Sequence, residues 1–187
     1  MRHTGKEIRA VCTDNFQTVP DNESEVKIMH KIKAAFIGEG GLLETMIGAV
    51  LERELLPPEN ILLSQDCEEE KAFEGKGVTY FSDTMNAVVK AEIVVVCASK
   101  KRELGTALAP ITGCTRGRIL IALCPDVDVA YIAERVVKGT AILAAPVRQD
   151  EDGAYHTMME FSKDFLPFQV EPCRDILGSV CVLDDFA

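Results

Sequence analysis

The sequence contains no tryptophan, only three histidines and no cysteine pair spaced as C-x-x-C. The histidines His3, His30 and His156 also lack the H-x-x-x-H spacing of a metal-binding helix. The seven cysteines are odd in number and scattered, so they indicate neither a disulfide framework nor a zinc site. We expect reduced thiols that serve mostly as small core side chains. They are Cys12, Cys67, Cys97, Cys114, Cys124, Cys173 and Cys181.

Positive charge and long apolar runs are also scarce. Twenty Lys and Arg stand against thirty Asp and Glu, which gives a formal net charge of −10 and a pI near 4.8. Non-specific binding to nucleic acid or to anionic membranes needs clustered Lys and Arg, so neither is an expected partner. No segment approaches the ~18 consecutive apolar residues of a membrane helix, and the opening residues lack the apolar core of a signal peptide. We expect a cytoplasmic protein whose partner is a small molecule or another protein.

The sequence does contain enough apolar residues for one globular core, since 47% of its 187 residues are hydrophobic. Residues 1–30 are polar with little periodicity and are predicted to be an N-terminal extension. Residues 31–150 alternate between apolar runs and helical patterns and are predicted to be the main domain. Residues 151–187, where the pattern weakens, form a C-terminal segment.

The alternation within the main domain predicts an α/β fold with a doubly wound parallel sheet and helices on both faces. Parallel neighbours need a crossover connection, and helices of about ten residues supply it. The β-branched run at 93–98 is typical of a central strand that is covered on both faces. Predicted strands lie at 32–37, 60–64, 77–81, 93–98, 118–123 and 140–145. Predicted helices lie at 42–54, 68–73, 82–90, 101–109, 127–137 and 155–165.

A glycine cluster follows the first predicted strand and opens the first helix. Gly38 and Gly40 are spaced as G-x-G, and the second strand ends about 25 residues later, as in a dinucleotide-binding β-α-β unit. The unpaired N–H groups and the positive end of the helix dipole suit a pyrophosphate. Leu43 stands where the fingerprint has a small residue, and should push the helix away from the sheet. Glu39 and Glu44 add negative charge unless they face solvent or a cation. The alternative interpretation is a Rossmann-like scaffold whose glycines only serve the turn.

The end of the second predicted strand, Ser64-Gln65-Asp66-Cys67, bears on the choice between NAD and NADP. An acidic residue there hydrogen-bonds a ribose 2′-hydroxyl, whereas an Arg accepts a 2′-phosphate. The segment has no Arg, and Asp66 would repel a phosphate, so NAD is favoured if either cofactor binds. Equally, Asp66 could simply cap the following helix.

The run AAFIGEGGLLETMIGAVLERELLPPENILLS at 34–64 resembles the N-terminal segment of pyrroline-5-carboxylate reductases. The resemblance includes the Leu-Pro-Pro-Glu-Asn turn at 56–60 and continues through Gly77-Val78, Asp83, the passage at 87–94 and Lys100. It covers residues 32–147 and fades toward the end of the chain. The family reduces pyrroline-5-carboxylate to proline with a nicotinamide cofactor. It combines an N-terminal Rossmann domain with an all-helical domain that dimerises and completes the substrate pocket.

The resemblance implies a set of cofactor-binding residues. The glycine cluster and the start of the helix would approach the pyrophosphate, and the end of the second strand would approach the adenosine. The segment after 93–97 would lie near the nicotinamide half, although a lysine in a KKRE run is usually only a solvated helix start. The residues concerned are Gly38, Gly40, Gly41, Leu42, Leu43, Ser64, Gln65, Ala98 and Lys100; catalytic residues are not identified.

Several motifs depart from the family pattern. Where the family has Met-Pro-Asn-Thr-Pro, this chain has the segment at 145–149, and where the family has Val-Lys-Pro, it has Ser99-Lys100-Lys101. The Ser-Gly-Ser-Gly-Pro-Ala motif that opens the family's helical domain is matched only in part, at 177–182. We therefore expect residues 151–187 to be a vestige or the start of that domain.

Three hypotheses follow. The chain is an NAD(P)-dependent reductase, with its pocket completed by a second copy or an unseen domain, in which Arg148 could hold a substrate carboxylate. Alternatively, it is a non-catalytic nucleotide-sensing or protein-interaction module. Finally, it could be a fragment of a longer protein. The apolar stretch at 176–186 is expected to pack on its own domain or on a second copy.

Overall fold

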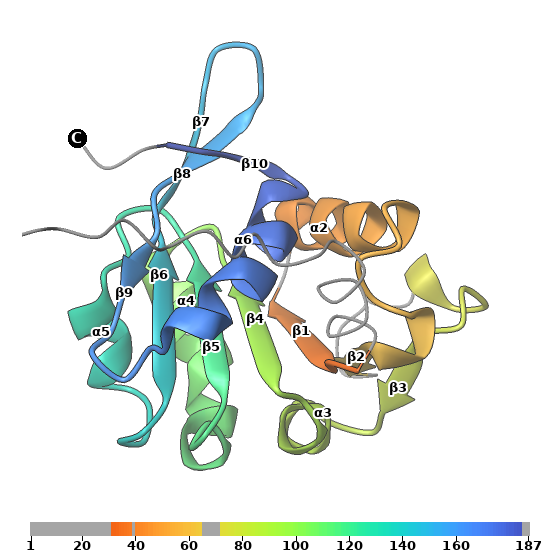
Figure 1. Cartoon of the computed structure of the whole chain (residues 1–187), viewed down its shortest axis with the longest axis horizontal. Helices are drawn as coiled ribbons and strands as arrows, with labels where there is room; N and C mark the ends of the chain where they lie inside the picture. The colour runs from red at the N-terminus through yellow and green to blue at the C-terminus, as the bar shows by residue number, and fades with distance from the viewer. Residues whose placement is uncertain (1–30, 39, 65–71, 185–187) are drawn as a thin grey trace, which may run out of the picture.

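A mostly parallel sheet of seven strands organises the chain (Figure 1). The structure, a computed structural model, describes residues 31–38, 40–64 and 72–184. The strand order is β3-β2-β1-β4-β5-β6-β9, and every neighbour pairs in parallel except β9, which runs antiparallel to β6. Because the chain winds outward from β1 in both directions, this is a doubly wound α/β fold. The predicted fold class is confirmed.

The strands lie close to the predicted positions. The central strand β4 is buried along its whole length, as its β-branched composition predicts. The predicted N-terminal extension at 1–30 and most of the helix at 68–73 lie outside the described residues. The strands of the main sheet are β1 (Ala34–Gly38), β2 (Ile61–Ser64), β3 (Thr79–Phe81), β4 (Ile93–Cys97), β5 (Ile119–Leu123), β6 (Ala141–Ala145) and β9 (Glu160–Phe161).

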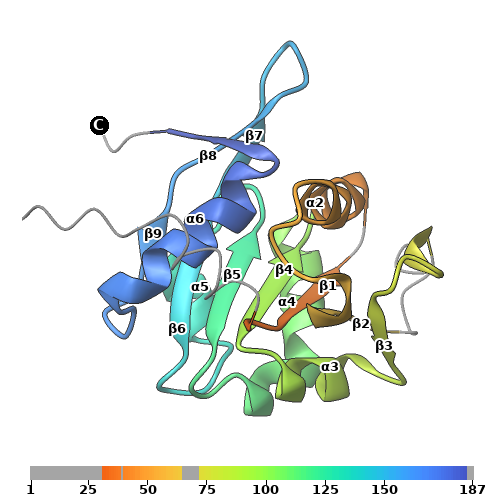
Figure 2. The same ribbon diagram turned by 45° about the vertical axis from the view of Figure 1, so that its right-hand side comes forward.

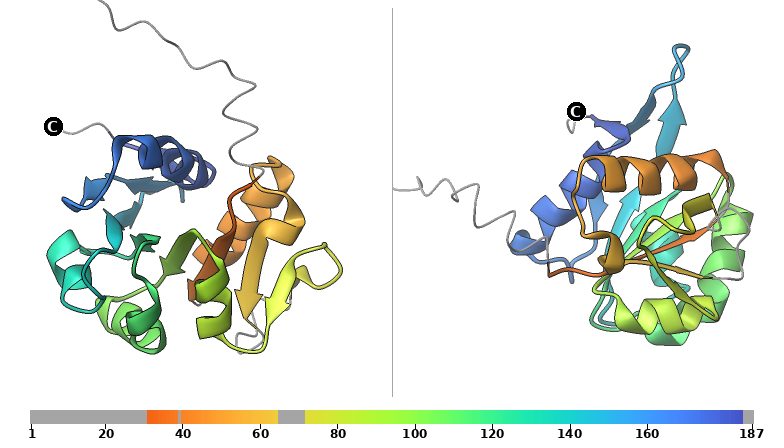
Figure 3. Two further views of the ribbon diagram at one scale, coloured as in Figure 1. Left: turned by 60° about the horizontal axis from the view of Figure 1, so that its bottom comes forward. Right: turned by 90° about the vertical axis from the view of Figure 1, so that its right-hand side faces the viewer.

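Helices cover both faces of this sheet. The helices are α2 (Gly41–Glu52), α3 (Thr84–Lys90), α4 (Lys101–Leu108), α5 (Val129–Ala133) and α6 (Val170–Gly178), and the 3₁₀ turns are η1 (Pro58–Asn60), η3 (Ala109–Cys114) and η4 (Pro167–Gln169). One apolar cluster joins the sheet to α2 and α6, and a second joins it to α3, α4 and α5. Figures 2 and 3 show α2 and α6 together on one face and the other three helices on the opposite face. In the described part of the chain, no helix has both the length and the apolar character needed to cross a membrane.

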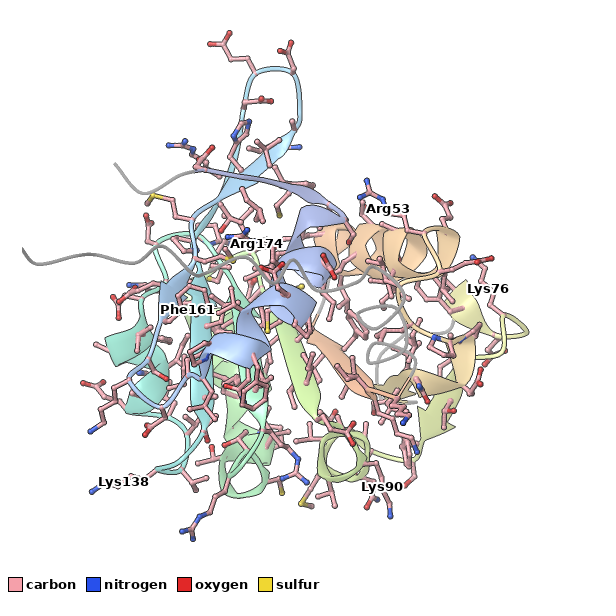
Figure 4. All side chains as sticks on the ribbon, viewed as in Figure 1. Arg53, Lys76, Lys90, Lys138, Phe161 and Arg174 are labelled. Atoms are coloured by element: carbon pink, nitrogen blue, oxygen red, sulfur yellow. The ribbon has the colours of Figure 1, made fainter. Side chains whose placement is uncertain are left out.

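The two helices of the first face are also joined at their ends. Helix α2 buries Leu43, Met46, Ile47 and Val50, a spacing of three or four residues that turns one stripe toward the sheet. Arg53, labelled in Figure 4, follows α2 and donates from Nη1 to the carbonyl oxygen of residue 178 at 3.2 Å, at the end of α6. The C-terminal helix therefore completes the core that α2 begins.

A second, smaller sheet extends from the end of β6. It contains β7 (Val147–Gln149), β8 (Tyr155–Thr157) and β10 (Cys181–Leu183) in the order β10-β8-β7. The hairpin of β7 and β8 rises above the main sheet in Figure 1, and β10 lies parallel to β8. Residues 151–184, the described part of the C-terminal segment, thus supply strands to both sheets and α6 to the core.

The helix predicted near 155–165 is wrong, because this stretch contains β8 and β9. From Thr157 to Glu160, buried and exposed side chains alternate residue by residue. A period of two is that of a strand with one buried face, whereas a helix would bury every third or fourth residue. The helix predicted at 127–137 is correct in place but shorter, since α5 spans only Val129–Ala133.

Candidate functional site

The carboxyl ends of the parallel strands meet at one edge of the main sheet, and the winding direction reverses between β1 and β4. Strand β1 has β2 on one side and β4 on the other. In open α/β sheets, ligands bind in the crevice outside the strand ends at such a switch point. In Figure 4, Lys90 and Lys138, which precede β4 and β6, mark the opposite edge at the bottom of the view. The candidate site lies at the upper edge, from which the β7–β8 hairpin rises.

The glycine turn, defined here by Gly38, Gly40 and Gly41, occupies the switch point. Gly38 has a φ of +130°, and a Cβ built on it would lie 2.0 Å from the carbonyl oxygen of Cys97 at the end of β4. Gly40 has a φ of +96° and precedes the first turn of α2. Only glycine combines such backbone angles with so close an approach of two strands. The turn therefore depends on these residues being glycine.

The amino end of α2 faces the space beyond this turn. The N–H groups of Gly41 and Leu42 precede the first helical hydrogen bond, which Leu43 donates to the carbonyl oxygen of Gly40 at 3.1 Å. Apart from its chain neighbours and the backbone of its own helix, no described atom lies within 4 Å of a Cβ built on Gly41. Free N–H groups and the positive end of the helix dipole suit an anion.

Two features count against a nucleotide site: the bulky Leu43 and the negative charges of Glu39 and Glu44. The structure shows how Leu43 and Glu44 are compatible with the turn. Leu43 is completely buried within the cluster shared by the sheet, α2 and α6, so a bulky residue fits at this position. Glu44 is exposed, and its charge is therefore screened by water. Glu39 lies outside the described residues.

The other cofactor residues predicted from the resemblance also lie at this edge. Ser64 ends β2 and is 2% exposed, and Ala98 follows β4 and is 8% exposed. Lys100 is exposed at the N-cap of α4. Gln65 and Asp66 lie outside the described residues. The fold thus brings eight of the nine predicted residues to the carboxyl edge; their contacts with a cofactor stay a prediction.

Sequence reasoning passed over Ser99. Its Oγ atom is the nearest described atom to a Cβ built on Gly40, at 3.9 Å. The side chain is exposed, and its hydroxyl has no hydrogen-bond partner among the described residues. Ser99 follows the end of β4, and its place beside Gly40 depends on the pairing of β1 with β4.

The helices beyond the switch point are fixed by a cluster around Tyr131 of α5. The Tyr131 hydroxyl donates to the carbonyl oxygen of Lys101 at 2.6 Å, and the Lys101 ammonium lies 3.6 Å from Asp128. Asp128 accepts the backbone N–H of Tyr131 at the start of α5, and this bond is the main reason that the pKa of its carboxyl is lowered. These contacts hold α4 against α5 beside the candidate site.

Arg148, considered above for a substrate carboxylate, is engaged elsewhere. Its Nη2 atom lies 2.6 Å from Asp184 in a cluster on the smaller sheet. His156 places Nδ1 3.1 Å from Asp184 and Nε2 3.1 Å from Asp150. Hydrogen bonds to Asp184 and then to Asp150 raise the pKa of His156. The cluster ties the hairpin to the end of β10, and no local pattern predicts it because Asp184 lies 28 residues from His156 and 36 from Arg148.

Most of the described cysteines are core residues. All five described cysteines are free, and Cys114 alone among them is partly exposed. Burial raises the pKa of Cys173 to about 12 and those of Cys124 and Cys181 to about 11, so these thiols stay protonated at neutral pH. Within the described ranges, no group of three or more Cys, His, Asp or Glu could hold a metal ion. The expectation that the cysteines serve mostly as small core side chains is confirmed for four of the five described ones; Cys12 and Cys67 lie outside the described residues.

These features define an α/β domain of the Rossmann type with a glycine turn at its switch point. No family model matches the chain, and no curated protein matches it. Among solved structures it resembles a pyrroline carboxylate reductase of Plasmodium falciparum with NADP bound, at a TM-score of 0.69 and 18% identity, covering 85% of this chain and 59% of that one.

Two further similar structures extend the comparison. The pyrroline-5-carboxylate reductase of Coxiella burnetii has a TM-score of 0.70 and 17% identity, with 84% of this chain and 60% of that chain covered. An imine reductase of Bacillus cereus has a TM-score of 0.60 and 15% identity, with 81% and 53% covered. The chain thus shares the fold of these reductases' matched part and spans at most about 60% of their length.

Proposed function

We propose that the chain binds a nicotinamide dinucleotide at the glycine turn and acts as a reductase of cyclic imines of the pyrroline-5-carboxylate type. The observation that carries the proposal is the glycine turn: Gly38 lies so close to the Cys97 carbonyl that no side chain fits, and the turn leads directly into the amino end of α2, where the N–H groups of Gly41 and Leu42 precede the first helical hydrogen bond. The likeness in fold to reductases solved with NADP supports it.

The residues at the carboxyl edge of the main sheet would contact different parts of the cofactor. The N–H groups of Gly41 and Leu42 would bind the pyrophosphate, and Ser64 would lie on the adenosine side. Ala98 and Lys100 would line the nicotinamide side. When bound, the cofactor supplies a hydride to the imine carbon, and the imine nitrogen takes up a proton to give the amine. Most of the acceleration comes from orienting the imine in a water-poor pocket, and we propose that a second copy or a further domain completes it.

The choice between NADP and NAD rests on two opposed observations. A similar reductase was solved with NADP bound, which favours NADP. The acidic residue Asp66 after β2 favours NAD, because it would repel a 2′-phosphate. A direct comparison of the two reduced cofactors decides between them.

A second candidate function is a non-catalytic module that senses a nucleotide or binds a protein. It is favoured by the segment at 145–149, which lacks the Asn and Thr of the family motif. A nucleotide site can persist without catalysis, because the sheet has its own core whereas catalytic geometry depends on the complete pocket.

The deciding experiment is a titration of the purified chain with NADPH and separately with NADH, followed by thermal stability and nicotinamide fluorescence. Ligand at 100 times its Kd should stabilise the fold by about 2.7 kcal/mol. The Gly40→Asp variant should lose this effect, because it places a side chain and a negative charge in the anion site.

The matched control is Gly117→Asp. Gly117 also has a positive φ, +73°, and no described atom near its Cβ position, but it precedes β5 at the opposite edge of the sheet. Equal loss in both variants, or no binding by the unmodified chain at millimolar nucleotide, would refute the cofactor site. Oxidation of the bound reduced cofactor on adding pyrroline-5-carboxylate separates the reductase from the non-catalytic module.

A further inference from the structure

Ser99 lies beside the glycine turn. Its Oγ atom lies 3.9 Å from the position of a Cβ on Gly40, with no other described atom closer to that position. Its hydroxyl is exposed and makes no hydrogen bond to any described residue. A polar group with no partner in the described part of the chain is therefore available to a ligand at this point.

The packing of β1 on β4 explains why Ser99 is there. Gly38 pairs with Cys97 in the sheet and approaches its carbonyl so closely that no side chain fits between them. Cys97 belongs to the cluster under α2, and Ala98 belongs to the cluster on the opposite face. Strand β4 ends at Cys97, and Ser99 follows in the bend that leads to α4, where its Oγ atom comes within 3.9 Å of the Cβ position of Gly40.

We propose that the Ser99 hydroxyl is a cofactor-binding group that donates a hydrogen bond to the pyrophosphate of the dinucleotide. The inference rests on the proposed cofactor site and adds a donor from β4 to the N–H groups of α2. An anion held by Gly41 and Leu42 would be contacted from the second wall of the crevice, and a hydroxyl that donates to an ionised oxygen makes a strong hydrogen bond. The added donor would offset the exposed negative charge of Glu44 in the first turn of α2.

The test compares the dissociation constants of NADH and NADPH for the unmodified chain, Ser99→Ala and Ser99→Thr. The alanine variant should bind both cofactors about tenfold more weakly, because the lost hydrogen bond goes to a group that both share. The threonine variant keeps the hydroxyl and should bind within about twofold of the unmodified chain. The control is Thr106→Ala, which removes an exposed hydroxyl of α4 that bonds to the Arg102 carbonyl oxygen at 3.2 Å.

Each outcome bears on a separate claim. If the unmodified chain binds and Ser99→Ala binds equally well, the inference about Ser99 is overturned while the cofactor site stands. A loss confined to NADPH overturns it too, since the contact would then be with the 2′-phosphate. If the unmodified chain binds neither nucleotide, the proposed function itself fails and Ser99 has no cofactor to contact.

Discussion

Replacing Gly38 by alanine should destabilise the fold far more than the same change three residues later. The new Cβ would lie 2.0 Å from the Cys97 oxygen, where real contacts of this kind essentially never fall below 3.0 Å. The two central strands would have to separate by about 1 Å, which resembles overpacking of a core and costs about 1–3 kcal/mol. A φ of +130° adds about 1–3 kcal/mol of backbone strain. Together these give an expected loss of about 2–6 kcal/mol, a large part of the ~5–15 kcal/mol that stabilises a typical protein.

Urea denaturation of Gly38→Ala and Gly41→Ala measures this difference from the midpoints and slopes. A Cβ on Gly41 meets no described atom within 4 Å, and position 41 opens α2, so its replacement should change stability by less than about 1 kcal/mol and in the stabilising direction. If Gly38→Ala also remained within about 1 kcal/mol of the unmodified chain, the close approach of β1 and β4 would not determine the residue at the turn.

Two further predictions concern the hairpin and α3. Because the pKa of His156 is raised, its stabilisation of β10 is complete below the ordinary value of 6.5 and is lost as the pH rises through the raised value. Because the pKa values of Asp150 and Asp184 are lowered, their stabilisation is present above about 3.8 and is lost as the pH falls through the lowered values. Hydrogen-exchange protection of β10 should therefore be highest between about pH 4 and 6.5, and His156→Gln should remove the decline above that range; an unchanged profile would contradict the cluster. Asp83→Ala removes the carboxylate that caps α3 at 2.8 Å and should cost about 1 kcal/mol in urea denaturation, whereas Asp83→Ser should restore most of it.

The strand and helix pattern of the main sheet could be predicted because its signals are local. The β-branched residues of β4, the N-cap at Asp83 and the apolar spacing along α2 each act over a few residues. The glycine turn could also be predicted, because its spacing indicates backbone angles that residues with a side chain rarely adopt. The strand order of the structure then places the switch point between β1 and β4.

The parts that could not be predicted depend on contacts between distant residues. His156 contacts Asp150, six residues away, and Asp184, 28 residues away. The second contact depends on the pairing of β10 with β8, which composition does not reveal. Ser99 gains its place only because β1 and β4, separated by more than fifty residues, touch at Gly38. The stretch at 155–161 was misassigned because the apolar run Met158-Met159 can be read as either a helix or a strand until its two faces are seen.

The position of α6 over α2 has a consequence for the order of events during synthesis. The side chains Met46 and Ile47 emerge early, yet their cluster is completed by Cys173, Ile176 and Leu177, more than a hundred residues later. A nascent chain must therefore carry a half-covered apolar sheet until almost all of the described sequence has left the ribosome. We expect chaperone holding at that stage and sensitivity to premature stops before residue 170, because α6 completes the core that α2 begins.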